Sequence, residues 1–109
     1  MKPNTFTPHK LVESNQMATY NPMLAMKLKN INSAVFLTTC IIKQALKPNE
    51  EWFSYTIEDM RMATGLSIYQ QKRVVNNLID KGLINYKVEG MPARRYFNLK
   101  WDTIGWYLY

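Results

Sequence analysis

Residues 53–99 decide the fold, and they read FSYTIEDMRMATGLSIYQQKRVVNNLIDKGLINYKVEGMPARRYFNL. The stretch opens with strand-forming aromatic residues. Two helix starts follow: Thr56 begins a variant capping box with Asp in its last position, and Ser67 begins a full Ser-x-x-Gln capping box. Gly65 and Gly82 are placed to end the two helices. The sequence therefore predicts a strand, a short helix, a turn and a second helix.

Two strands complete this stretch. Residues 83–89 and 95–100 alternate between apolar and polar side chains with the period of a strand. Residues 90–93, Gly-Met-Pro-Ala, join them as a hairpin tip. Together with the first strand at residues 52–55, they predict a three-stranded antiparallel sheet in an α+β fold that is mainly α.

Helices are also predicted on either side of this stretch. Asn21-Pro22 is typical of a helix start, and Asn32 or Ser33 can cap a longer helix that ends near Lys47-Pro48. We expect the inner side of that longer helix to hold Ala34, Leu37, Ile41, Ile42, Ala45 and Leu46. A last short helix can start at Asp102. Residues 1–20 read as a flexible arm and residues 21–109 as one folded domain.

Length and composition limit the class of protein. A chain of 109 residues, 47% of them hydrophobic, is expected to form one packed domain. The single cysteine, Cys40, lies in the apolar run VFLTTCII and reads as a buried small hydrophobe. The N-terminus has no apolar signal segment and no apolar stretch is long enough to span a membrane, so we expect a cytoplasmic protein.

The positive charge is concentrated in one part of the chain. The net charge is +6, and residues 61–100 carry all of it, because the remaining lysines and acidic residues balance. A basic patch confined to one module is typical of a protein that binds a polyanion such as nucleic acid. The alternative is a basic face that serves only solubility.

The helix at residues 68–81 has two distinct sides when it is plotted at 100° per residue. One side is the predicted core seam and holds Ile68, Gln71, Val75, Leu78 and Ile79, with Val74 at its border. The other side is rich in groups that can read base edges, since Arg pairs with guanine and Asn or Gln with adenine. It holds Tyr69, Gln70, Arg73, Asn76, Asn77 and Asp80, with Lys72 beside them.

The hairpin adds further basic candidates. Alternation places Arg94 and Arg95 on opposite sides, so we expect one of them, Arg94, to face DNA; Arg95 can instead stabilise the hairpin. Exposed backbone amides after Ser67 can hold a phosphate. The complete predicted DNA-binding set is Ser67, Tyr69, Gln70, Lys72, Arg73, Asn76, Asn77, Lys87, Arg94 and Arg95.

Nothing in the sequence favours an enzyme. His9 is the only histidine and lies in the predicted arm, and no Gly-rich phosphate loop is present. The pair Glu58-Asp59 is explained by the positive end of a helix. We therefore expect no catalytic residues, no metal and no cofactor, and we interpret four methionines as core filler: Met23, Met26, Met60 and Met62.

The run TIEDMRMATGLSIYQQKRVVNNLIDKGLINY resembles winged helix-turn-helix domains. With the upstream helices and the aromatic strand, residues 22–99 are similar to the N-terminal domains of phage and plasmid replication initiators, which include replisome-organiser and DnaD-like proteins. The resemblance implies a winged helix with DNA contacts at Tyr69, Gln70, Lys72, Arg73 and Asn76. Such initiators are usually longer than this chain.

Three functions remain open. The leading one is sequence-specific binding of double-stranded DNA in replication initiation, with replisome proteins as further partners. The second is transcriptional regulation with the same DNA chemistry. The third is a winged-helix interaction module that does not bind DNA; it self-associates through the aromatic C-terminal residues Trp101, Trp106, Tyr107 and Tyr109. No membrane partner is expected.

Overall fold

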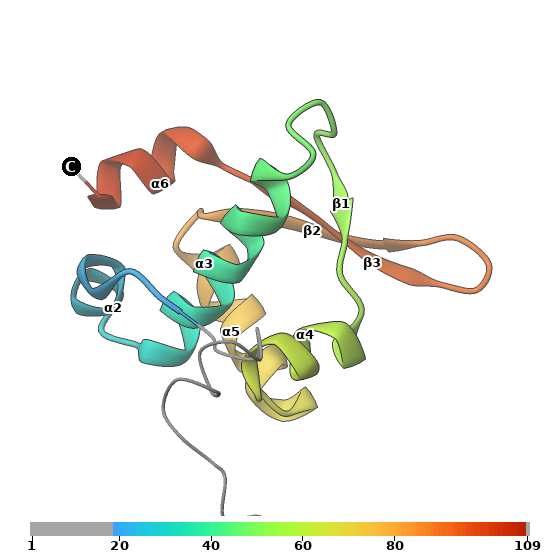
Figure 1. The fold of residues 1–109 in the computed structure, drawn as a ribbon, viewed down its shortest axis with the longest axis horizontal. Helices are drawn as coiled ribbons and strands as arrows, with labels where there is room; N and C mark the ends of the chain where they lie inside the picture. Colours follow the sequence, from blue (N-terminus) through green and yellow to red (C-terminus); the bar gives the residue numbers. More distant parts are fainter. Residues whose placement is uncertain (1–18, 109) are drawn as a thin grey trace, which may run out of the picture.

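Five helices and three strands make up residues 19–108, the part of the chain that the computed structural model describes (Figure 1). The predicted arm lies outside this part, apart from its last two residues, and so does His9. The helices are α2 (Pro22–Leu28), α3 (Ile31–Ala45), α4 (Ile57–Thr64), α5 (Ile68–Asp80) and α6 (Trp101–Leu108), and the strands are β1 (Phe53–Ser54), β2 (Ile84–Glu89) and β3 (Arg94–Leu99). The predicted α+β class, mainly helical, is confirmed.

The three strands form one antiparallel sheet in the order β1-β3-β2. The predicted hairpin is present as β2 and β3, which pair along their full length from Ile84 opposite Leu99 to Glu89 opposite Arg94. The far end of this hairpin extends beyond the helices (Figure 1). The sheet thus has a buried end inside the helical body and a free end outside it.

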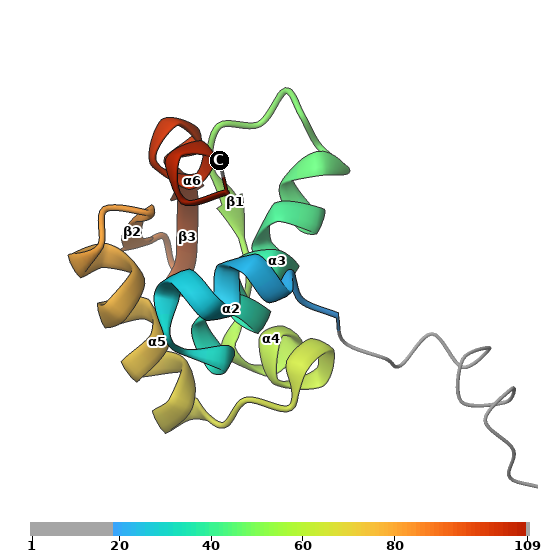
Figure 2. The same ribbon diagram turned by 90° about the vertical axis from the view of Figure 1, so that its left-hand side faces the viewer.

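Phe97 on β3 lies at the centre of the core and is fully buried. Its ring centroid is 5.7 Å from that of Phe36 on α3, 6.0 Å from that of Phe53 on β1 and 5.4 Å from that of Tyr86 on β2. These four aromatic rings join the sheet to α3. In the view of Figure 2, α2 lies between α5 and α4, with α6 above it.

The predicted helix starts are confirmed at three of five places, those of α2, α4 and α5. Asn21 caps α2 with Pro22 as its first residue, Thr56 caps α4, and Ser67 caps α5 in a complete capping box with Gln70. Each side chain satisfies a backbone N–H that has no partner within its own helix. Sequence alone therefore locates these helix starts correctly.

The predicted cap of α3 at Asn32 or Ser33 is wrong. Asn30 is the cap, because its Oδ1 accepts a hydrogen bond from the Ser33 backbone N–H at 2.9 Å. Ser33 instead lies inside the first turn and is fully buried. Three polar residues within four positions offered several possible caps, and packing of Ser33 decides between them.

The predicted inner side of α3 is partly wrong. Ala34 and Leu37 are buried as expected, but Ile42 is exposed and Leu46 is 76% exposed. The core takes other residues of α3, namely Phe36, Cys40 and Gln44. Apolar residues surround this helix on nearly every side, so their spacing could not single out the buried face.

The interpretation of four methionines as core filler holds for Met60 alone, which is fully buried; Met23, Met26 and Met62 are exposed. Cys40 is fully buried, as predicted.

Within residues 19–108, none of the helices combines the length and apolar content needed to cross a bilayer.

Candidate nucleic-acid interface

Helix α5 carries a continuous exposed row of Tyr69, Lys72, Arg73 and Asn76. Tyr69 is 74% exposed, although tyrosine is a large side chain that proteins commonly half-bury. Among residues 19–108, none of these four side chains makes a hydrogen bond or an ion pair. The row is therefore available to a partner molecule.

The start of α5 is fixed by the turn that precedes it. Gly65 has a φ of 79°, a left-handed conformation that side chains rarely adopt, and its N–H donates to the Arg61 carbonyl at 2.7 Å. Ser67 then begins the capping box: Gln70 Oε1 accepts from the Ser67 N–H at 2.8 Å, and Ser67 Oγ accepts from the Gln70 N–H at 3.2 Å. Gln70 is exposed, but its carbonyl oxygen is already engaged in the cap.

The inner side of α5 is anchored by a buried amide rather than by apolar contacts alone. Gln71 is fully buried, as the helical plot predicts. Its Nε2 donates to the carbonyls of Ile57 and Leu66, each at 3.0 Å. These carbonyls belong to the first turn of α4 and to the loop after it. One side chain thus joins α5 to both ends of α4.

Arg95 is half-buried and hydrogen-bonded to other parts of the protein. Its Nη2 donates to Gln71 Oε1 at 3.0 Å and its Nε donates to the Tyr55 carbonyl at 2.9 Å. The guanidinium also lies 5.1 Å from the Phe97 ring centroid. Partial burial lowers the pKa of Arg95 from its ordinary value, since the charged form loses solvent. These hydrogen bonds fit the stabilising role of Arg95, and a DNA contact of this residue stays a prediction.

A groove of about 250 Å³ separates α5 from the hairpin. Its walls are Ile57, Lys72, Val75, Asn76, Tyr86 and Arg95. Lys72 and Asn76 belong to the exposed row of α5, so this row continues into the groove. Sequence reasoning did not select Tyr86, although its alternation with Ile84 places it on the inner face of β2.

Asn77 does not share the exposed row. Its Nδ2 donates to the Ser33 hydroxyl of α3 at 2.7 Å, and its side chain is half-buried. The helical plot put Asn77 on the outer side because it considered α5 alone. In the folded protein α3 packs against that edge, so Asn77 connects two helices.

Lys87 and Arg94 lie on the outer face of the sheet, opposite to the face that lines the groove. The Lys87 ammonium is 4.1 Å from the centroid of the Trp52 ring and 3.5 Å from Glu89 Oε1. Arg94 lies opposite Glu89 in the strand register. Lys87 is thus paired with a carboxylate on this face, and Arg94 lies opposite the same residue in the register.

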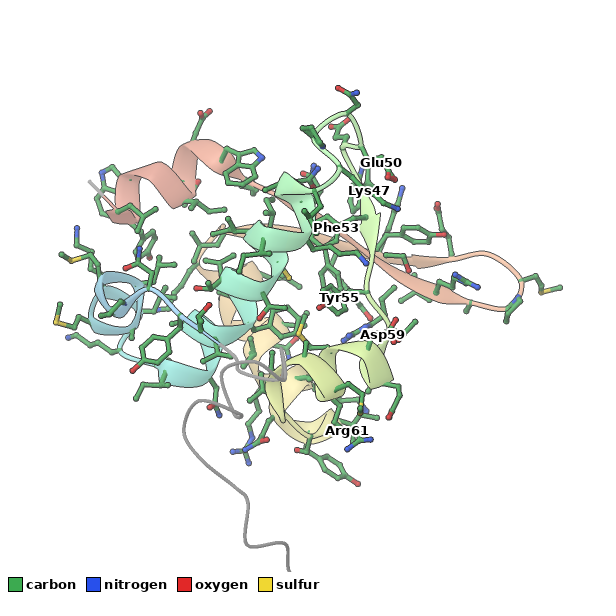
Figure 3. The ribbon with its side chains drawn as sticks, viewed as in Figure 1. Lys47, Glu50, Phe53, Tyr55, Asp59 and Arg61 are labelled. Carbon is green, nitrogen blue, oxygen red and sulfur yellow. The ribbon has the colours of Figure 1, made fainter. Side chains whose placement is uncertain are left out.

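Two other basic residues are paired with carboxylates. Figure 3 shows Lys47 beside Glu50 after α3 and Arg61 on α4, at opposite ends of the molecule. The Lys47 and Glu50 charged groups are 3.9 Å apart, and Arg61 pairs with Glu58 at 2.5 Å. Within residues 61–100, Lys72 and Arg73 belong to the exposed row, whereas Arg61 is paired with Glu58 on α4 and Lys87 with Glu89 on the sheet.

Helix α6 packs on the core of its own chain. It starts at Trp101, one residue before the predicted start, and buries Ile104, while Tyr107 and Leu108 pack against the core cluster. Trp106 remains 75% exposed. Trp101 is also exposed, Tyr109 lies outside the described residues, and self-association through this segment stays a prediction.

Residues 19–108 contain no group of three or more His, Cys, Asp and Glu side chains placed to hold a metal ion.

Comparison of the chain with protein-family models, with curated proteins and with solved structures finds no significant match in any of the three.

Proposed function

We propose that the chain is a winged helix-turn-helix domain that binds double-stranded DNA. In this proposal α4 and α5 are the helix-turn-helix, α5 is the recognition helix, and the β2–β3 hairpin is the wing. The observation that carries the proposal is the exposed row of Tyr69, Lys72, Arg73 and Asn76, which runs along α5 into the groove beside the hairpin.

The chemistry of this row suits the major groove, which admits an α-helix and presents a distinct set of donors and acceptors for each base pair. Arg73 can donate two hydrogen bonds to guanine, and Asn76 can pair with adenine. Lys72 can contact a phosphate, which positions the helix without reading sequence. Tyr69 can contact a phosphate or a thymine methyl group.

The anchoring of α5 supports the same proposal. A helix that reads base edges must be held at a fixed angle, because small displacements break paired hydrogen bonds. The Gln71 and Arg95 hydrogen bonds connect α5 to α4 and to β3. The three parts of the proposed DNA-binding unit are thereby joined through one polar network.

The biological role proposed for this domain is replication initiation of the phage or plasmid type. The support is the resemblance of residues 22–99 to the N-terminal domains of such initiators. Transcriptional regulation uses the same DNA chemistry and is the second candidate. Binding sites that repeat within a replication origin favour the first role, and sites over a promoter favour the second.

Selection from a random duplex pool, followed by titration of the enriched duplex, tests the proposal. We expect the wild-type chain to enrich a sequence and Arg73→Ala to weaken its binding by about 1–3 kcal/mol if the contact is bidentate to guanine. Lys47→Ala is the matched control, because it removes one positive charge far from α5 (Figure 3). Absence of duplex binding at low salt contradicts the proposal.

A further inference from the structure

The free end of the hairpin is apolar. Residues 90–93 are Gly-Met-Pro-Ala, and Met91 at this tip is 99% exposed. We infer that Met91 and Pro92 form a wedge that enters the DNA minor groove, unstacks one base step and kinks the duplex. The inference rests on the proposed function and adds a deformation of the DNA to it.

The length of the hairpin suits this role. Tyr86 lines the groove beside α5, and Met91 lies five residues farther along the hairpin, just beyond the end of strand β2. At ~3.3 Å per residue, Met91 lies roughly 17 Å beyond Tyr86. Half of a ~34 Å turn of B-DNA has the same length. With α5 in the major groove, the tip therefore reaches the neighbouring minor groove.

The charges around the tip favour an apolar contact over a phosphate contact. The first charged residues on either side are Glu89 and Arg94, which lie opposite one another in the register. The Lys87 ammonium is 3.5 Å from Glu89 Oε1, so its positive charge offsets the repulsion between the Glu89 carboxylate and DNA phosphates. A tip that held phosphates would carry the cation itself, whereas methionine and proline are among the side chains that wedge between base pairs.

The position of the tip favours DNA over a protein partner. An exposed methionine can also fill a pocket on another protein. Here, however, the strand that leads to Met91 also provides Tyr86 to the groove beside Lys72 and Asn76. The tip is thus continuous with the proposed DNA-binding surface. The expected consequence is a duplex with one opened step beside the bound site.

The experiment uses a duplex of 24 base pairs that carries the sequence enriched by the wild-type chain, with a fluorophore at each end. Binding of the wild-type chain should increase energy transfer, because a kink shortens the distance between the ends. Met91→Ala should lose this increase, and Met91→Leu should retain it. Met91→Ala loses the favourable contact and also the free-energy cost of unstacking, and these two changes oppose each other. Its dissociation constant for the duplex should therefore change by about tenfold or less.

Met26→Ala is the matched control, since Met26 is 64% exposed on α2, on the opposite side of the molecule from the hairpin end (Figure 1). It should bend the duplex as the wild-type chain does. The inference is overturned if the wild-type chain binds without bending, or if Met91→Ala bends the duplex fully. If the wild-type chain binds no duplex, the proposed function itself fails, which is a distinguishable result.

Discussion

Arg95 on β3 donates a hydrogen bond from Nη2 to Gln71 Oε1 on α5 at 3.0 Å, and this contact joins the hairpin to the proposed recognition helix. Gln71 is fully buried, and its amide nitrogen is bonded to two backbone carbonyls. All the polar groups of this amide are therefore satisfied inside the protein. The arrangement sets the position of the exposed row of α5 relative to the hairpin.

Gln71→Leu should lower the free energy of unfolding by about 2–4 kcal/mol, because it removes the amide partner of the Ile57 and Leu66 carbonyls and of Arg95 Nη2. Chemical denaturation followed by circular dichroism measures the change. Lys72→Ala, on the exposed side of the same helix, should change stability by less than about 0.5 kcal/mol. Equal stability of Gln71→Leu and the wild-type chain would show that the network does not anchor α5.

The adjacent pair Asn76 and Asn77 should respond in opposite ways. Asn77→Ala should destabilise the fold by about 1–2 kcal/mol, because the buried Ser33 hydroxyl loses its hydrogen bond, and the folded variant should bind DNA normally. Asn76→Ala should leave stability unchanged and weaken binding to the selected duplex. Denaturation and duplex titration of both variants check this. Weaker binding by folded Asn77→Ala would place that residue at the DNA.

Stability should fall at alkaline pH because of Cys40. Burial raises the pKa of its thiol well above the ordinary value of 9.0, so the unfolded chain releases this proton at a lower pH than the folded chain. The protonated Cys40 thiol contributes fully to the free energy of unfolding below about pH 9. This contribution falls by about 1 kcal/mol between pH 9 and pH 10. Unfolding free energies of the wild-type chain and of Cys40→Ala at these two pH values should show a shallower decrease for Cys40→Ala. Equal decreases would contradict the assignment.

Binding should depend on salt through Lys72. A phosphate contact releases bound counterions, so Lys72→Ala should weaken binding to all duplexes alike and reduce the slope of log K against log salt by about 1. Fluorescence anisotropy at several salt concentrations measures the slope. The Lys47→Ala control should keep the wild-type slope, and a Lys72→Ala slope equal to wild type would exclude a phosphate contact there.

Local signals in the sequence predicted much of the fold. The capping residues Asn21, Thr56 and Ser67 each act within a few residues of their own position, so the sequence shows them directly. The alternation of the hairpin strands is local in the same sense. These features could be predicted because their physical cause does not depend on the rest of the molecule.

Tertiary packing decided what the sequence could not predict. The position of Asn77 depends on α3, which approaches α5 through Ser33, more than forty residues away in the chain. The role of Arg95 depends on Gln71 and Tyr55, which belong to other elements. Charge counting likewise treated residues 61–100 as one patch, whereas strand alternation places Lys87 and Arg94 on a different face from α5.

The most direct measurement of the central claim is a nuclear magnetic resonance titration of the full isotope-labelled chain with the selected duplex. We expect backbone amide signals to shift for residues 67–76 of the α5 region and for residues 86–94 of the hairpin. Signals of α2 and α6 should stay in place. Shifts confined to α2 and α6, or none at all with the duplex in excess, would contradict the proposal that the exposed row of α5 binds DNA.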